Sequence, residues 1–381
     1  MHRFDVYRGQ RTVGPRYLPT ILLTLLAIIL IGFIALFFTL PGHLVYTRDS
    51  VRLDLPSLQG ESAVVTPAMS EGEPSDAAVT EGESGEAPDY STLTAELVVK
   101  EPDYSALNYA TGEGLEIVQS VYVPYEKVNG DGLTAAIAQA RALDVKALTL
   151  ELRDESGVTL WSSKAELAEA YGLNGTTDVR ASIEDLKKQG YRLTAVISCC
   201  VDNTLAARNA PAALKNAAGL PYADNGGSWM DPWDAGVRSL SIQLTKELME
   251  MGFDEVVLNH VEHPVSDVGY SRTMSGNLTR VASVTNFAIA VREGVEETMA
   301  ATGAKLSAMI STEALNNASY DNGQNLAYFL HVFDRVYEFT ETYSEASQVV
   351  SLGIDSTERF VPIISWVFPG ASWVQNPFAD K

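Results

Sequence analysis

Basic residues, cysteines and phosphate-binding motifs are all scarce in this chain of 381 residues. Its 27 Lys and Arg are outnumbered by 49 Asp and Glu, giving a net charge of −22. Because nucleic-acid binding needs a concentrated basic surface, this balance argues against a nucleic-acid partner. The only two cysteines, Cys199 and Cys200, are adjacent, and neighbouring Cα atoms about 3.8 Å apart cannot form an unstrained disulfide. We expect both thiols to be reduced and buried in a strand, with no redox or metal role.

Charged side chains are absent from Leu18 to Leu40, a run long enough to cross a bilayer core of about 30 Å as a helix. Four arginines lie in the 17 residues before it, whereas charges balance just after it, so the positive-inside rule places the N-terminus in the cytoplasm. A cleaved signal peptide is the alternative, although its apolar region is normally only about 7 to 15 residues. We predict a cytoplasmic tail (1–17), an uncleaved transmembrane helix (18–40) in the lipid bilayer of the cell membrane, and an extracellular remainder.

The segment 41–113 is predicted to be an acidic extracytoplasmic tether. Apolar groups are too few in its Gly-, Pro- and Glu-rich stretches to offset the entropy of ordering, and like charges extend the chain. Pro88-Asp-Tyr-Ser and Pro102-Asp-Tyr-Ser repeat within it, followed by the apolar stretches Leu93–Val99 and Leu107–Ala110. We interpret these as parts of a linker that docks on its own domain; a short strand pair or partner-binding element is the alternative.

Residues 114–381 alternate short β-rich runs with amphipathic helices, which is typical of a parallel sheet wrapped by helices. The expected strands are Ile117–Val123, Ala147–Leu152, Arg192–Cys199, Glu255–Leu258, Lys305–Ile310, Arg335–Phe339 and Phe360–Trp366. The clearest helices are Leu133–Leu143, Val179–Gln189, Trp233–Met251, with an expected cap at Asp231-Pro232, and Val281–Ala301. The length is close to the ~250 residues of a (β/α)8 TIM barrel. A doubly wound sheet is the second choice, but no Gly-rich phosphate turn follows the first strand, so neither a Rossmann site nor any cofactor is predicted.

Barrel closure requires an eighth strand that the alternating pattern does not supply. Few residues follow Trp366, and no further strand–helix unit is visible there. We therefore expect an incomplete or non-standard eighth strand, supplied by the tail around Ser372 to Val374 or by the apolar tether segments, because an unpaired edge invites aggregation.

The end of the second expected strand carries three close carboxylates. Period-two alternation places Leu148, Leu150 and Leu152 on one face and Glu151 on the other, pointing into the barrel mouth. Asp154 and Glu155 follow in the loop, where they serve either acid–base chemistry or simple solvation and capping. Repulsion between neighbouring carboxylates raises the pKa of one of them, so that it stays protonated. Hydrolysis of a glycosidic bond uses such a protonated carboxyl group as its general acid.

Several ordered motifs resemble a bacterial family of glycoside-hydrolase-like domains whose barrel is distantly similar to the α-amylase barrel. They are Leu150-Glu-Leu-Arg-Asp-Glu-Ser-Gly157, Lys215-Asn-Ala-Ala-Gly219, Trp229-Met-Asp-Pro-Trp233, Gly252-Phe-Asp-Glu-Val256 and Pro264. The resemblance spans about residues 117–340 and implies a carbohydrate-related barrel, often tethered to a cell envelope.

The same comparison shows departures at the expected active site. The resembled family reads Phe-Asp-Tyr-Ile-Arg-Phe-Pro where this chain reads Leu258-Asn-His-Val-Glu-His-Pro264, so the expected nucleophile is Asn259. Met309 stands where the next strand of the family carries an Asp, and Asp334 to Glu341 replaces a further family pattern. An amide or a thioether cannot supply the negative charge that stabilises an oxocarbenium-like transition state.

A new cluster of His260, Glu262 and His263 follows the fourth strand. Its spacing matches no strong zinc signature, so no metal is predicted. Aromatic side chains that could stack on sugars, or simply fill the core, are Trp161, Trp229, Trp233 and Trp366. Carboxylates that could substitute for the lost one are Glu262, Glu313 and Glu338.

Two functions follow. The favoured one is a catalytically degenerate barrel that binds a cell-envelope polysaccharide or envelope protein, with weak or absent hydrolysis. The alternative is an active surface glycosidase that uses Glu151 with a substitute carboxylate. For both, the candidate catalytic set is Glu151, Asp154, Asn259 and Glu262, and the candidate substrate-binding set is Trp161, Trp229, Trp233, His260, His263, Glu313 and Glu338.

Overall fold

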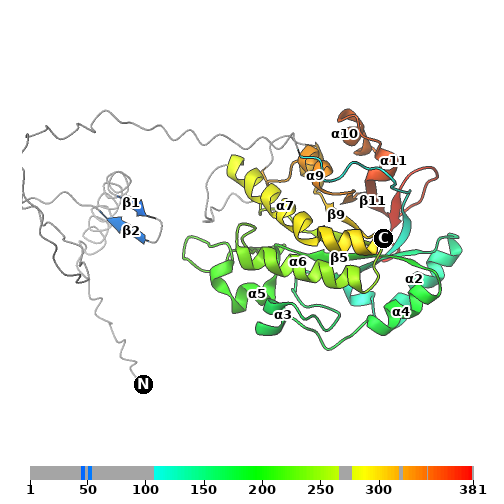
Figure 1. Cartoon of the computed structure of the whole chain (residues 1–381), viewed down its shortest axis with the longest axis horizontal. Coiled ribbons are helices and arrows are strands. Elements are labelled where there is room, and N and C mark those ends of the chain that lie inside the picture. The colour runs from blue at the N-terminus through cyan, green and yellow to red at the C-terminus, as the bar shows by residue number, and fades with distance from the viewer. Residues whose placement is uncertain are drawn as a thin grey trace, which may run out of the picture. The chain divides into compact units, whose positions relative to one another are not determined.

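The computed structural model describes residues 44–47, 50–53, 107–265, 277–316, 321–340 and 342–379 (Figure 1). Contacts divide the chain into two compact units, Met1–Leu93 and Thr94–Lys381. In the first unit, strands β1 (Leu44–Thr47) and β2 (Ser50–Leu53) pair antiparallel. The predicted membrane span, 18–40, lies outside the described residues. Within them, no helix combines the length and apolarity needed to cross a bilayer.

The second unit contains a closed barrel of eight parallel strands, in the order β10-β11-β12-β3-β4-β5-β8-β9. Their bounds are β3 (Gln119–Val123), β4 (Ala147–Arg153), β5 (Arg192–Ser198), β8 (Glu255–Asn259), β9 (Lys305–Met309), β10 (Val336–Phe339), β11 (Phe360–Ile364) and β12 (Trp373–Gln375). The seven predicted strands are confirmed. The eighth is β12, which comes from the C-terminal tail as predicted and pairs with both β11 and β3.

Helices cover the outside of the barrel (Figure 1). They are α2 (Asp131–Ala142), α3 (Glu166–Ala170), α4 (Arg180–Lys188), α5 (Asn203–Arg208), α6 (Ala235–Glu250), α7 (Asn277–Thr302), α8 (Thr312–Asn316), α9 (Leu326–Val332), α10 (Ala346–Ser351) and α11 (Ser356–Arg359). The four predicted helices appear as α2, α4, α6 and α7. The predicted cap of α6 is wrong: Asp234 accepts from the Val237 N–H, whereas Asp231 accepts from the Trp233 N–H in the preceding turn.

Alternation along β4 separates an outer from an inner layer. Leu148, Leu150 and Leu152 are fully buried in the core between strands and helices. Thr149 faces the barrel interior, where its hydroxyl lies 2.7 Å from that of Ser120 on β3. Because side chains alternate along a strand, Glu151 follows Thr149 on the inner face, as the sequence predicts.

The loop after β4 is fixed by a buried ion pair. Arg153 donates to the Asp202 carboxylate and to the carbonyl oxygen of Gly157, and Asp202 also accepts from the first turn of α5. Gly157 has φ of +78°, and a Cβ there would lie 1.8 Å from an Asp202 oxygen. This position therefore requires glycine for both its backbone conformation and its space.

The end of the predicted tether packs on the barrel. The backbone N–H groups of Tyr109 and Ala110 both donate to the His331 carbonyl in α9 at 3.0 Å. Arg292 of α7 donates to the Tyr109 carbonyl, and the Tyr109 hydroxyl donates to Glu293. The docking predicted for Leu107–Ala110 is confirmed; Leu93–Val99 lies outside the described residues.

Candidate functional site at the barrel mouth

The inner faces of five strands end in side chains of mixed chemistry at the carboxyl end of the barrel. They are Tyr122 of β3, Glu151 of β4, Ser198 of β5, Asn259 of β8 and Met309 of β9. Tyr122 and Met309 belong to the cluster that fills the barrel interior, and Ser198 pairs in register with Asn259. Active sites of such barrels lie at this end, so these strands present their last inner side chains to the candidate site.

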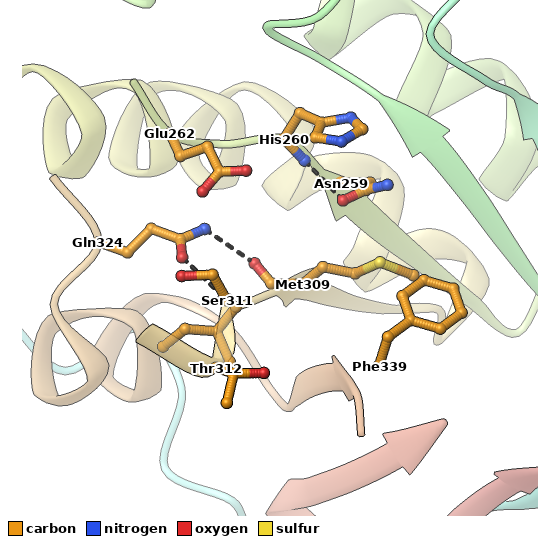
Figure 2. Close-up of a pocket in the computed structure, with 9 residues that line it drawn as sticks. Asn259, His260, Glu262, Met309, Ser311, Thr312, Gln324 and Phe339 are labelled. Atoms are coloured by element: carbon orange, nitrogen blue, oxygen red, sulfur yellow. Dashed lines mark hydrogen bonds between the residues drawn. The ribbon is translucent and has the colours of Figure 1, made fainter. Parts of the chain in front are cut away.

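A cavity of about 250 Å³ opens between the ends of β8, β9 and β10. Figure 2 shows its main lining residues, Asn259, His260, Glu262, Met309, Ser311, Thr312, Gln324 and Phe339. Gln324 closes one side: its amide donates to the Met309 carbonyl at 3.2 Å, and its side-chain oxygen accepts from the Ser311 N–H at 2.9 Å. Of the described residues that line this cavity, Glu262 alone has a carboxyl group.

A second cavity, of about 400 Å³, adjoins the first and shares Glu262 and Ser311 with it. A short hairpin, β6 (Ala223–Asp224) and β7 (Gly227–Ser228), forms part of its wall. The Trp229 ring N–H donates to the Asp224 carboxylate at 2.9 Å, which holds this tryptophan against the hairpin. Glu313 also lines the cavity, on an exposed position of α8.

Glu262 is a carboxyl group that stays protonated more readily than usual. Burial raises its pKa to about 7, the Asn322 amide that donates to it at 2.7 Å lowers it, and Glu313 and Asp224 raise it. Near neutral pH this group is therefore able to donate a proton as well as accept one, which a general acid requires.

Glu151, on the other side of β5, also has a raised pKa. Burial raises its pKa to about 7, while the Tyr125 N–H, which donates at 3.1 Å, and the Tyr122 hydroxyl lower it. The Tyr122 ring meets the Phe339 ring edge to face at 5.4 Å. Since Phe339 lines the 250 Å³ cavity, these two rings connect the surroundings of Glu151 with the cavity.

His260 has an unusual backbone and a neutral ring. Its φ of +53° is a conformation that few residues other than glycine adopt, and its N–H donates to the Asn259 side-chain oxygen. Burial lowers the pKa of its imidazole to about 4, although Asp224 opposes this. One ring nitrogen lies 3.0 Å from the Ser198 hydroxyl, and the Trp229 ring stands edge-on at 6.3 Å.

The remaining candidate residues are distributed over other parts of the fold. Trp161 is fully buried and donates to Glu247 of α6, Trp233 lies beneath Arg238 at the start of α6, and Trp366 is exposed beside Phe368. His263 lines the second cavity, with one ring nitrogen 2.7 Å from the Ser283 hydroxyl of α7.

Two candidate carboxylates also lie away from the cavities. Asp154 accepts from the Ser156 N–H within its own turn. Glu338 is 1% exposed on the face of β10 opposite the inward Tyr337, where burial raises its pKa to about 7 and the Thr312 hydroxyl lowers it. The described residues contain no group of three or more His, Cys, Asp or Glu side chains arranged to hold a metal ion.

Sequence reasoning missed several residues of the mouth. Ser198 is the last but one residue of the predicted strand Arg192–Cys199, and Phe339 ends the predicted strand Arg335–Phe339, so the alternation that placed Glu151 could also have found them. Asp224 lies in the short β6–β7 hairpin and Gln324 in a loop, both outside the barrel strands, and no periodic signal marks them.

A family described as "putative glycosyl hydrolase domain" matches residues 120–338, more than half of the chain. The chain belongs to this family. Its match begins in β3 and ends in β10, and it includes Asn259, Glu262 and Met309 at the cavities. No curated protein matches the sequence.

Several solved structures of low sequence identity are similar to this chain. The glycoside hydrolase domain of PgaB (BpsB) from Bordetella bronchiseptica is 12% identical with a TM-score of 0.52, over 65% of this chain and 84% of that one. A hypothetical protein from Ruminiclostridium thermocellum is 20% identical with a TM-score of 0.43, over 50% and 96%. The α-galactosidase TtGalA from Thermus thermophilus is 13% identical with a TM-score of 0.39, over 66% and 49%. At these identities the likeness to PgaB establishes the fold alone.

Proposed function

We propose that this glycosyl hydrolase domain binds a cell-envelope polysaccharide in the two cavities of its mouth and hydrolyses it weakly or not at all. The observation that carries the proposal is the lining of the 250 Å³ cavity, where Asn259 and Met309 occupy the inner strand ends and Glu262 is the single carboxyl group among the described lining residues. Hydrolysis by the usual mechanism needs two carboxyl groups across one cleft, one of them ionised.

The retained family motifs support this interpretation because they build the frame of the barrel. Arg153 and Gly157 fix the loop after β4 through Asp202, and the Trp229 carbonyl accepts from the Leu214 N–H between two loop segments. The departures, Asn259 and Met309, lie at the mouth instead. A chain under pressure to fold but not to hydrolyse would keep the first group and lose the second.

The alternative is an active glycosidase, and the surroundings of Glu151 and Glu262 favour it. Each of these groups has a pKa raised to about 7 by burial, so one could donate a proton while the other ionises. Such a pair would restore hydrolysis without the carboxylate that Asn259 replaces.

The test combines binding and hydrolysis on a panel of neutral and acidic envelope polysaccharides. We expect binding by the wild-type protein, weakened at least several-fold by Glu262→Gln, with no measurable turnover. Glu184→Gln, the same change on the exposed side of α4, is the control that leaves binding unchanged. Rapid turnover that disappears in both Glu151→Gln and Glu262→Gln would favour the active enzyme, and an absence of binding across the panel would contradict the proposal.

The proposal places the barrel outside the cell, held at the membrane by Leu18–Leu40. The uncharged run and the arginines before it support this arrangement. Protease added to intact cells should then remove the barrel, whereas protection of the barrel would contradict it.

A further inference from the structure

The hydrogen bonds around His260 assign the proton on its ring. The Ser198 hydroxyl donates to the Val201 carbonyl at 2.7 Å, so its oxygen is left to accept from His260 Nδ1 at 3.0 Å. In the neutral imidazole one nitrogen carries hydrogen and the other a lone pair. Nδ1 therefore carries the hydrogen, and Nε2 is an acceptor.

That acceptor faces a second acceptor across a short gap. His260 Nε2 lies 3.7 Å from Oε1 of Glu155, too far for a hydrogen bond, and a carboxylate oxygen, like the Nε2 lone pair of this neutral imidazole, is an acceptor. No described residue donates a hydrogen bond to either atom. A donor placed about 2.8 Å from both would satisfy them together.

The charges around His260 Nε2 and the Glu155 carboxylate indicate which kind of donor would bind between them. The described residues that line the two cavities include no lysine or arginine, whereas Asp224, Glu262 and Glu313 line them and Asp224 acts electrostatically on His260. A sugar hydroxyl has one hydrogen and no charge, so it satisfies one acceptor and leaves the carboxylates unmatched. A primary ammonium has three hydrogens and a positive charge, so it satisfies both acceptors and is attracted by the carboxylates.

We propose that His260 Nε2 and the Glu155 carboxylate form a binding site for a primary ammonium group on the saccharide, so that the preferred ligand is an amino sugar with a free amine. This rests on the proposed saccharide-binding function and adds the substrate class. It also gives a use for the left-handed backbone of His260, because a residue held in a strained conformation beside a cavity commonly has a functional role.

The test uses three β-1,4-linked tetrasaccharides that differ at carbon 2: the glucosamine tetramer, its N-acetylated form and cellotetraose, measured by calorimetry with the full-length protein. The glucosamine tetramer should bind about tenfold or more tightly than the other two, since hydrogen bonds to charged groups are the stronger ones. The preference should shrink as salt rises.

Two variants separate the contribution of this pair from folding. His260→Asn suits the left-handed backbone and keeps an N–H toward Ser198, but it removes Nε2; Glu155→Gln keeps the shape and removes the charge. Both should reduce the ratio of the affinity for the glucosamine tetramer to the affinity for cellotetraose several-fold, and Glu184→Gln should leave all three affinities unchanged.

The outcomes distinguish this proposal from the proposed function. Equal affinities for the three tetrasaccharides, or an amine preference that survives both variants, would overturn the ammonium site and leave saccharide binding intact. If the tetrasaccharides do not bind, the ammonium site is wrong, and the polysaccharide panel decides separately whether the barrel binds saccharide at all.

Discussion

The two ends of this barrel bury carboxyl groups in opposite electrostatic settings. At the end of the barrel opposite the mouth, here called the floor, Glu255 of β8 is fully buried. It lies 2.9 Å from Arg335 and 3.2 Å from Arg192. Burial raises the pKa of this carboxyl, but the two guanidinium groups and the Ser307 hydroxyl outweigh it and hold the pKa below its usual range. At the mouth, Glu262 has an amide partner and carboxylate neighbours, and its pKa rises to about 7.

The contrast teaches how to separate structural from functional carboxyl groups in one barrel. Glu255 is paired with cations, so it is ionised, satisfied and unable to exchange a proton near neutral pH. Glu262 and Glu151 pair with no cation among the described residues, and Glu262 lines a cavity, so each keeps a proton available and can respond to a ligand. Burial alone does not distinguish them; the partners do.

The largest expected effect on stability comes from removing Arg335 from its ion pair with Glu255 at the floor. Arg335→Met should lower the free energy of unfolding by about 3 to 5 kcal/mol, because it leaves Glu255 buried beside only the partly exposed Arg192. Urea denaturation of the variant and of the wild type measures this loss in the free energy of unfolding. The double variant Arg335→Met, Glu255→Met should recover much of the loss, since an apolar pair replaces an unpaired charge. A loss under about 1 kcal/mol in the single variant would show that the pair is not what stabilises the floor.

A smaller effect on stability is expected at the mouth, where it depends on pH through Glu262. Because the folded pKa of Glu262 lies above its unfolded value, its favourable contribution is present at low pH and is lost as pH rises from about 4.5 through about 7. Glu262→Gln should remove that loss, so the variant should gain on the order of 2 kcal/mol relative to wild type between pH 4.5 and pH 8, allowing for the partial exposure of the side chain.

The matched control is Glu184→Gln, the same change at an exposed carboxyl group of α4. The floor should behave oppositely, because the lowered pKa of Glu255 gives stability above its unfolded pKa that is lost as pH falls. If Glu262→Gln and wild type have parallel stability curves from pH 4.5 to pH 8, the mouth does not hold a protonated carboxyl.

Sequence periodicity predicted the parts of this contrast that depend on single strands. The alternation Leu148, Leu150, Leu152 placed Glu151 inside the barrel, and the need to close the edge predicted an eighth strand from the tail or from the tether, of which the tail supplies β12. Neither depends on knowing which other segments lie nearby, because both follow from the geometry of one strand or one sheet edge.

Properties that depend on several strands could not be predicted. Arg335 and Glu255 are 80 residues apart, and nothing in either segment indicates that they meet at one end of the barrel. Similarly, Ser198 determines the proton position on His260 across 62 residues, and Glu338 faces the helices although its strand ends at the mouth. Contacts between strands, rather than patterns within them, decide which carboxyl groups are paired.

The smallest expected effect tests whether the floor depends on its charge or also on its hydrogen bonds. The Ser307 hydroxyl donates to Oε1 of Glu255 at 2.6 Å in a fully buried position, so Ser307→Ala removes one donor and leaves both cations in place. We expect a loss of about 1 to 2 kcal/mol in the free energy of unfolding, as for one hydrogen bond to a charged group. Ser241→Ala is a suitable control, because that buried hydroxyl donates to the Val237 carbonyl within its own helix and has a neutral acceptor. A larger loss in Ser307→Ala than in Ser241→Ala would show that the Glu255 carboxylate is ionised; equal losses would indicate a neutral Glu255 and remove the difference between the two ends of the barrel.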